Sequence, residues 1–200
     1  MEIEYFIDEK DWEETFSYWL EQMLAFAQKV GIKKDHLKTR EHKKEELSHY
    51  SQKTVDIEYL FPFGQSELYG LAYRTDYDLR NHAEKSGVDL SYQDQKSGEK
   101  FFPHVVEPSF GLERTLLALL LDAYHEEEVR GEKRTVLRLA PQIAPVKVAV
   151  FPLLANKEDL VKEAKRVFNE LAASFISDFV DIGNIGKRYR RQDEIGTCIL

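Results

Sequence analysis

The sequence predicts an α+β fold, with an antiparallel sheet in the longer N-terminal part and a small α/β unit at the C-terminal end. Residues 54–106 contain short segments of alternating apolar and polar residues, joined mostly by tight turns, which is typical of antiparallel strands. Residues 146–182 follow the order strand, helix, strand, which favours two parallel strands joined by a helix. The change of character predicts two domains, 1–141 and 142–200.

The composition is that of a folded protein, because 42% of the 200 residues are hydrophobic and 12% are aromatic. The longest apolar run, Leu116–Leu121, is far too short to cross a bilayer. The single cysteine, Cys198, cannot form an internal disulfide or build a structural zinc site alone. Acidic residues near Met1 take the place of the basic start of a signal peptide. We therefore expect a cytoplasmic protein that does not enter a membrane and has no metal ligands of its own.

The N-terminal part is predicted to begin with a strand over residues 1–7, where apolar and acidic residues alternate. Asp11, with Glu14 three residues later, predicts a capping box at the start of a helix that ends at Gly31. The highly charged stretch over residues 35–51 predicts a second helix.

The rest of the chain is predicted as strands with a few helices. Strands are expected at residues 54–61 and 66–73, a short helix at 75–87, a hairpin at 88–93 and 99–106, and an apolar helix at about 112–125. After a polar stretch at 125–133, the C-terminal unit is expected to contain a strand at 146–153, a helix at 157–174 and a strand at 179–182.

The segment Glu-Pro-Ser-Phe-Gly-Leu-Glu-Arg, residues 107–114, is the most informative for chemistry. Glu107 and Ser109 are two residues apart, so on a strand they point the same way and could bind one ammonium group together. Gly111 allows another molecule to approach the backbone. Arg114, at the start of a helix, suits a polyphosphate, because its guanidinium can bind phosphate oxygens in pairs. The alternative is an ordinary strand–turn–helix junction with a surface ion pair.

Two basic clusters stand out in a chain whose formal net charge is -8. That charge argues against general coating of nucleic acid but leaves local contact open. The cluster at Lys33–Lys44 is best interpreted as a solvated helix face. The cluster at Lys187–Arg191 could bind RNA, or could pair with Asp193 and Glu194 at the surface.

A family resemblance rests on several of these segments. Gly-Leu-Glu-Arg at 111–114, followed by an apolar helix, resembles motif 3 of the class II aminoacyl-tRNA synthetases, and Glu-Pro-Ser at 107–109 is similar to its glycyl-specific version. Other segments agree in the same order along the chain: residues 1–6, 66–70, 74–79, 183–189 and 193–197. The chain thus resembles glycyl-tRNA synthetases over essentially all of its residues.

This resemblance implies a fold and a reaction. Residues 1–141 would be the C-terminal part of an antiparallel-sheet class II catalytic domain, from the end of motif 2 through motif 3. Residues 142–200 would be the start of an α/β anticodon-binding domain. The implied activity is ATP-dependent ligation of glycine to tRNA-Gly, with Mg²⁺, by a protein that is a homodimer when full length.

The resemblance also implies site residues. The glycine-binding set is Glu2, Glu107, Pro108, Ser109, Phe110 and Gly111. The ATP-binding set is Glu67, Leu68, Gly111, Leu112, Glu113 and Arg114. Charge, and placement in the anticodon-binding domain, suggest tRNA contacts for Lys187, Arg188, Arg190 and Arg191. No side chain is expected to act as nucleophile or general base.

The chain departs from the family pattern in two places. Motif 1 and the part of motif 2 that carries the arginine for the α-phosphate are absent, so we expect a fragment that cannot form glycyl-adenylate alone. The proline that usually follows the threonine at 197 is also missing. Two alternatives are a prolyl, threonyl or histidyl synthetase and a non-catalytic relative, such as the accessory subunit of a mitochondrial DNA polymerase. Glu-Pro-Ser at 107–109 argues against the first alternative, and the intact Glu107, Ser109 and Arg114 argue against the second.

Overall fold

The structure, a computed structural model, describes residues 1–129 and 131–200. The chain forms two compact units: Met1–Gln28 with Lys33–Ala118, and Lys29–Ile32 with Leu119–Leu200. Helices are combined with an antiparallel sheet, as predicted for an α+β fold. The predicted domain boundary at residues 141 and 142 stays a prediction.

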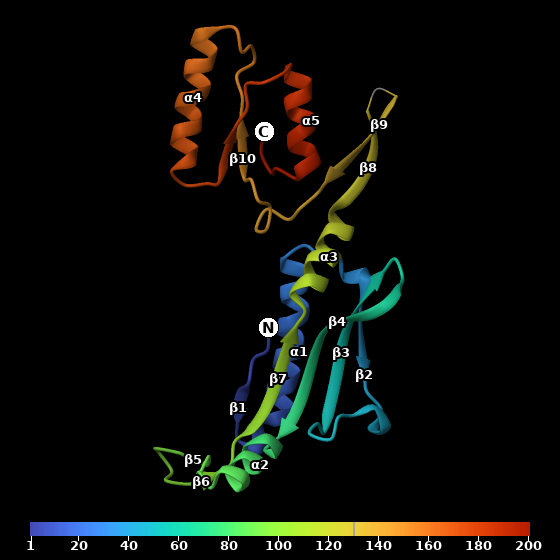
Figure 1. The fold of residues 1–200 in the computed structure, drawn as a ribbon, viewed down its shortest axis with the longest axis vertical. Coiled ribbons are helices and arrows are strands. Elements are labelled where there is room, and N and C mark those ends of the chain that lie inside the picture. The colour runs from blue at the N-terminus through green and yellow to red at the C-terminus, as the bar shows by residue number, and fades with distance from the viewer. Residues whose placement is uncertain (130) are drawn as a thin grey trace. The chain divides into compact units, whose positions relative to one another are not determined.

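The first unit is built on a five-stranded sheet with the order β1-β7-β4-β3-β2 (Figure 1). All four pairs of neighbouring strands are antiparallel. The strands are β1 (Tyr5–Ile7), β2 (Leu37–Glu41), β3 (Lys53–Phe61), β4 (Gly64–Thr75) and β7 (His104–Phe110).

Helix α1 (Trp12–Lys29) covers one face of this sheet (Figure 1). The Trp12 ring stacks on Tyr73 at a centroid distance of 4.5 Å, and Phe26 packs against Tyr69 at 6.4 Å. Leu71, between these two tyrosines on β4, is fully buried. The apolar core of the unit therefore lies between α1 and one face of the sheet, and the other face is free for polar residues.

The start of α1 differs from the sequence-based prediction. Asp8 caps the chain here: its Oδ1 accepts the backbone N–H of Lys10 at 3.1 Å, and a 3₁₀ turn at Glu9–Asp11 leads into α1. The predicted capping box at Asp11 is therefore wrong, because Asp11 is the last residue of this turn and Asp8 is the residue that caps it.

The predicted helix over residues 35–51 is also wrong. This stretch forms strand β2 between 3₁₀ turns at Lys34–His36 and Lys44–Glu46. Strand β2 pairs with β3 at the edge of the sheet, with Leu37 opposite Tyr59 and Glu41 opposite Val55. Edge strands are commonly rich in charge. Of the basic cluster that suggested a solvated helix, Lys38 and Arg40 lie on this edge strand, and the other lysines lie in or next to the two 3₁₀ turns.

The chain between β4 and the second unit contains short elements. Helix α2 (Tyr77–Ser86) ends at Gly87, whose left-handed conformation closes the helix. The predicted hairpin is present only as the two-residue strands β5 (Tyr92–Gln93) and β6 (Lys100–Phe101). Strand β7 then leads into α3 (Leu112–Ala123).

The second unit begins with a hairpin that the sequence-based prediction missed. Strands β8 (Tyr124–Val129) and β9 (Glu132–Leu137) pair across a stretch predicted only as polar; Arg130 lies outside the described residues. The predicted strand–helix–strand unit is confirmed, because β10 (Val148–Val150) and β11 (Ser177–Phe179) pair in parallel around α4 (Glu158–Ala172). Helix α5 (Ile185–Ile195) follows.

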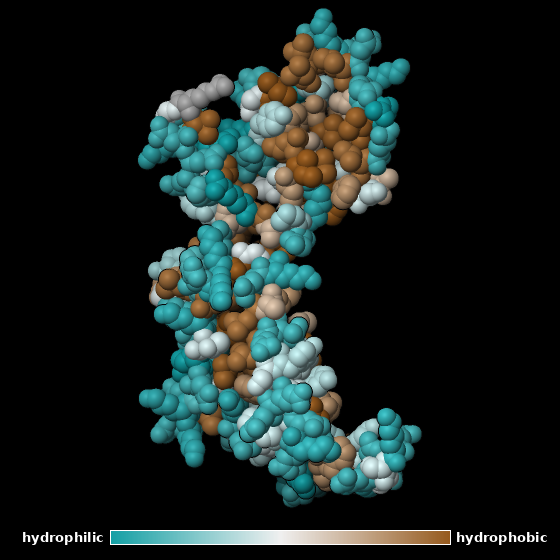
Figure 2. Space-filling model, turned by 180° about the vertical axis from the view of Figure 1, so that it is seen from behind, coloured by the Kyte–Doolittle hydropathy of each residue, from teal (hydrophilic) through white to brown (hydrophobic). Residues whose placement is uncertain are grey.

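The second unit has a small core and considerable apolar surface. Ala144, Val148 and Ala149 are buried, and Figure 2 shows hydrophobic side chains gathered on the surface of this unit. The large apolar residues that are exposed here include Leu153, Leu154, Phe175, Ile176 and Ile182. Within the described part of the chain, no helix combines the length and the apolar character that crossing a membrane requires.

Leu71→Ala tests the position of the core. Leu71 is 0% exposed, so its removal leaves a cavity and should lower the free energy of unfolding by roughly 2–5 kcal/mol in urea denaturation. Leu60→Ala is the matched control, because Leu60 lies on β3 and is 53% exposed. Equal losses in the two variants would contradict the described core.

Candidate functional site

The sheet face opposite α1 carries a row of residues that are paired from strand to strand. Ser109 pairs with Gly70, Gly70 pairs with Asp56, and Asp56 pairs with Arg40, while Glu2 forms an isolated bridge with Ser109. Directly paired residues point to the same face of a sheet. The row therefore has acidic groups on both sides of a glycine, with the Ser109 hydroxyl among them.

Glu107 lies beside this row and is not free. It is 8% exposed and forms an ion pair with Arg74, whose Nε also donates to Asp78 Oδ2 at 2.8 Å. The Arg74 guanidinium stacks over the Tyr50 ring, 4.1 Å from its centroid. Burial alone would lower the pKa of Arg74, but the hydrogen bonds to Glu107 and Asp78 outweigh it and raise that pKa. Glu107 is thus held as an oriented carboxylate.

Sequence analysis did not assign Arg74 to the site. In the sequence, the segment 74–79 carries only a resemblance to the family. Ala72 of β4 pairs with Glu107, and Arg74 follows it two residues later on the same strand. Side chains two residues apart on a strand point the same way, so this alternation could have indicated that Arg74 lies near Glu107.

Carboxylates outnumber cationic groups around Ser109. Burial raises the pKa of Glu4, and the negative charges of Glu107, Asp78 and Glu2 raise it further, while Arg74 opposes them. An ionised carboxylate in such surroundings is stabilised by a bound cation. The site therefore favours a small cationic group such as an ammonium.

Two residues of the expected glycine set face the other way. Pro108 is fully buried and pairs with Leu71, and Phe110 packs edge-on against Phe26 of α1 at 5.8 Å. Their side chains belong to the core side of β7, whereas Glu107 and Ser109 face the polar side.

Gly111 serves the packing of the chain itself. A Cβ at this position would lie 3.3 Å from the backbone oxygen of Leu68 and 3.5 Å from Cβ of Arg114. The hydroxyl of Thr115, one turn into α3, donates to Gly111 O at 2.6 Å and lies 3.1 Å from the Tyr69 hydroxyl. Glycine thus lets α3 begin close against β4.

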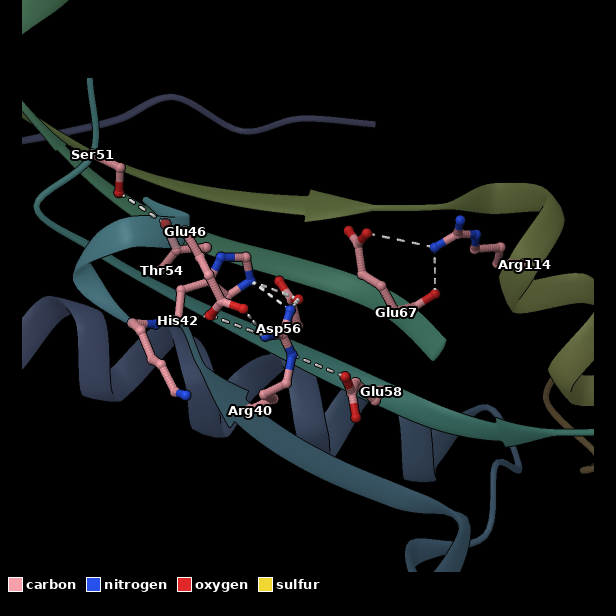
Figure 3. Close-up of polar contacts among 10 residues, drawn as sticks. Arg40, His42, Glu46, Ser51, Thr54, Asp56, Glu58, Glu67 and Arg114 are labelled. Carbon is pink, nitrogen blue, oxygen red and sulfur yellow. Dashed lines mark hydrogen bonds and ion pairs between the residues drawn. The ribbon is translucent and has the colours of Figure 1, made fainter. Parts of the chain in front are cut away.

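The expected ATP residues Arg114 and Glu67 lie together (Figure 3). Arg114 Nη1 donates to the Glu67 backbone oxygen at 2.5 Å and lies 3.5 Å from its Oε2; both side chains are 51% exposed. The other Glu67 oxygen, Oε1, reaches to 3.5 Å from the place of a Cβ on Gly70. The Arg114–Glu67 pair is therefore adjacent to the acidic row. Of the other members of this set, Leu68 is buried, while Leu112 and Glu113 are exposed.

A polar cluster that sequence analysis missed closes the other end of the row (Figure 3). Arg40 donates to Glu58 Oε1 and to Asp56 Oδ2, each at 3.1 Å. His42 Nε2 lies 2.7 Å from Asp56 Oδ2, and Arg40 also contacts Glu46 at 3.3 Å. Asp56 is thereby fixed from two sides.

The basic cluster of the second unit lies on α5, and its four members have different environments. Arg188 is 2% exposed and donates to the backbone oxygens of Pro152 at 2.5 Å, Asp181 at 2.8 Å and Gly183 at 2.7 Å. Arg188 is thus a structural residue, because it links α5 to the segments that follow β10 and β11. Its expected contact with tRNA is therefore corrected, because a guanidinium so enclosed cannot reach a phosphate.

The other three basic residues of α5 are exposed. Arg190 pairs with Glu194 at 2.9 Å, and Arg191 has one long hydrogen bond of 3.4 Å to a backbone oxygen. Lys187 and Arg190 line a groove between α5 and the β8–β9 hairpin. Asp193, a suggested partner of the cluster, instead pairs with Arg134 of β9 at 2.8 Å.

No family model matches the chain. The chain is 53% identical to a glycine–tRNA ligase of Caldanaerobacter subterraneus subsp. tengcongensis over 197 residues, which cover 98% of the chain and 42% of that relative. Along its whole length, the chain is homologous to glycine–tRNA ligases. It is 48% identical to the ligase of Geobacillus thermodenitrificans and 50% identical to that of Lachnoclostridium phytofermentans, in both cases over 100% of the chain and 43% of the relative.

The likeness to glycine–tRNA ligases confirms the family resemblance that the motifs indicated. It favours the glycyl prediction over a prolyl, threonyl or histidyl synthetase and over a polymerase accessory subunit. The chain spans about 43% of the length of these curated ligases.

Arg188→Met tests the structural role of this residue. The change keeps the apolar stem but leaves buried backbone oxygens without donors, so the free energy of unfolding should fall by roughly 2–4 kcal/mol in urea denaturation. Arg191→Met, on the exposed side of α5, should change it by less than about 0.5 kcal/mol. An Arg188→Met variant as stable as the wild-type protein would contradict the structural role, and Arg188 would again be a candidate for contact with tRNA.

Proposed function

We propose that the protein that carries this chain is a glycine–tRNA ligase, which activates glycine with ATP and transfers it to tRNA. One observation supports this most strongly: the acidic row around Ser109 and the Arg114–Glu67 pair lie side by side on one open face of the sheet. A cation-binding site thus adjoins a phosphate-binding arginine. The names of the relatives support the same reaction.

Glycine would be held by its ammonium group. Glu2 and Ser109 supply acceptors, and Glu107, oriented by Arg74, supplies the buried charge. Charge-assisted hydrogen bonds of this kind are shorter and stronger than neutral ones. Because glycine has no side chain to grasp, selectivity has to come from reading the ammonium group and from excluding larger amino acids.

ATP would be bound beside the amino acid. The half-exposed Arg114 can bind phosphate oxygens through paired N–H groups. Mg²⁺ commonly binds through one or two carboxylates together with substrate phosphates. Glu67 fits that role, since its carboxylate is half-exposed beside Arg114.

The reaction would take place in two steps. A carboxylate oxygen of glycine attacks the α-phosphorus of ATP, and the bond to pyrophosphate breaks, which yields glycyl-adenylate. A hydroxyl at the 3′ end of tRNA then attacks the glycyl carbonyl, and AMP leaves. The residues described here position the reactants and neutralise charge, so no side chain needs to act as a nucleophile.

The two parts of the chain would contribute differently. We propose that residues 1–141 belong to a class II catalytic domain and that residues 142–200 begin an anticodon-binding domain, in a protein that works as a homodimer. Lys187, Arg190 and Arg191 are the candidates for contact with tRNA phosphates, because they are exposed on α5 of an otherwise acidic chain.

Glu107→Gln, made in the complete protein, tests the glycine site. Loss of a charged acceptor should raise KM for glycine roughly ten- to a hundredfold and leave KM for ATP nearly unchanged, as measured by glycine-dependent ATP–pyrophosphate exchange. Asp78→Asn is the matched control, because it also removes a partner of Arg74 and should have a much smaller effect. An unchanged KM for glycine in Glu107→Gln would contradict the assignment.

Arg114→Lys tests the nucleotide site. Lysine keeps the charge but cannot form the paired contact of a guanidinium, so the exchange rate should fall at least tenfold with a raised KM for ATP. Arg80→Lys is the matched control, because Arg80 is another exposed arginine that pairs with an acidic side chain and belongs to no proposed site. Equal exchange by the Arg114→Lys variant and the wild-type protein would show that Arg114 does not contact ATP.

Replacing Lys187, Arg190 and Arg191 by Ala tests the contact with tRNA. If these side chains meet phosphates, tRNA affinity should fall and its dependence on salt should flatten, because fewer counterions are released. Glycyl-adenylate formation should stay intact. Replacing Lys157, Lys162 and Lys165 removes the same charge at the α4 side of the unit. Equal losses of tRNA affinity in the two triple variants would show that only the net charge of the protein matters, and would contradict a specific contact on α5.

A further inference from the structure

Gly70 occupies the middle of the acidic row. It pairs with Ser109 of β7 on one side and with Asp56 of β3 on the other. Neighbouring Cα atoms in antiparallel pairs are about 5 Å apart, so the flanking side chains rise from points separated by roughly 10 Å. The missing side chain therefore leaves a trough between the Ser109 hydroxyl and the Asp56 carboxylate.

The fold itself does not require a glycine here. Gly70 is not among the glycines with positive φ, so its backbone conformation is open to other residues. An added Cβ would meet only Glu67 Oε1, at an ordinary 3.5 Å and at the end of a half-exposed side chain. Gly196 shows the contrast, because its φ is +79° and its Cβ would lie 2.9 Å from Leu139.

Glycine inside a strand usually makes it less stable than alanine would. A central strand that carries this cost without a conformational or packing need indicates close approach of another molecule. Strand β4 is central, with β3 and β7 on its two sides.

We propose that Gly70 determines amino-acid specificity: the space above its Cα holds the amino end of the amino-acid substrate. This inference rests on the proposed function. The charge beside the trough favours the amino acid over ATP, because Glu2, which is bridged to Ser109, would attract an ammonium group and repel ATP phosphates. Asp56 is a firm wall, since Arg40 and His42 hold it at 3.1 and 2.7 Å.

Gly70→Ala and Gly70→Val, made in the complete protein, test the proposal by glycine-dependent ATP–pyrophosphate exchange. A methyl group in the trough should lower kcat/KM for glycine at least tenfold, and the larger valine should lower it further. KM for ATP should stay within twofold of the wild-type value. The thermal unfolding midpoint should stay equal or rise, because alanine suits a strand better than glycine does.

Gly186→Ala is the matched control, because it adds the same methyl group on α5, where the nearest atom lies at 3.8 Å. Its exchange rate should equal that of the wild type. If the wild-type protein catalyses exchange and the Gly70→Ala variant has the same kcat/KM for glycine, this inference is overturned and the proposed function stands. A raised KM for ATP in Gly70→Ala would show that the nucleotide occupies the trough. A lowered unfolding midpoint would show that Gly70 has a structural role. Either result would overturn the inference. A wild-type protein without exchange would overturn the proposed function as well.

Discussion

Successive side chains of a β-strand point to opposite faces of the sheet, and in this chain one helix covers only one of those faces. Tyr69, Leu71 and Tyr73 therefore face α1, while Gly70 and Ala72 face the open side. A shift of register by one residue would exchange the two sets completely. The cross-strand row, and with it every assignment to the site, depends on this pairing.

The electrostatic character of the open face follows from the same pairing. Strands that are far apart in sequence bring Glu2, Glu107 and Asp56 to one surface. Like charges on adjacent strands destabilise a sheet unless a counter-charge is supplied. Arg74 supplies it for Glu107, and Arg40 supplies it for Asp56, so the region around Glu2 and Ser109 is left for a cation from outside.

Most of the regular structure could be predicted from local pattern. The strands β3 and β4 have clear alternation, and the glycine–helix junction at Gly111 is recognisable from a short motif. Strand β2 could not be predicted, because its charged residues have no apolar period and only pairing with β3 makes them a strand. Local pattern also placed an acidic cap at Asp11, whereas Asp8 caps the 3₁₀ turn that leads into α1.

Within the site, sequence reasoning found the residues of β7 and α3 and missed their partners. Arg74 lies 33 residues before Glu107, and such a pairing depends on the register of two strands. Arg188 shows the opposite error, because a basic run in the sequence does not reveal that one member turns into the fold and binds three backbone oxygens. Burial and long-range pairing are therefore what the structure adds.

A crystal structure of the complete protein with a non-hydrolysable glycyl-adenylate analogue tests the central claim most directly. The account predicts that the ammonium group lies over Gly70, within hydrogen-bonding distance of Ser109 and Glu2. An analogue bound elsewhere, or bound with its phosphate over Gly70, would contradict the claim that the acidic row holds the amino acid.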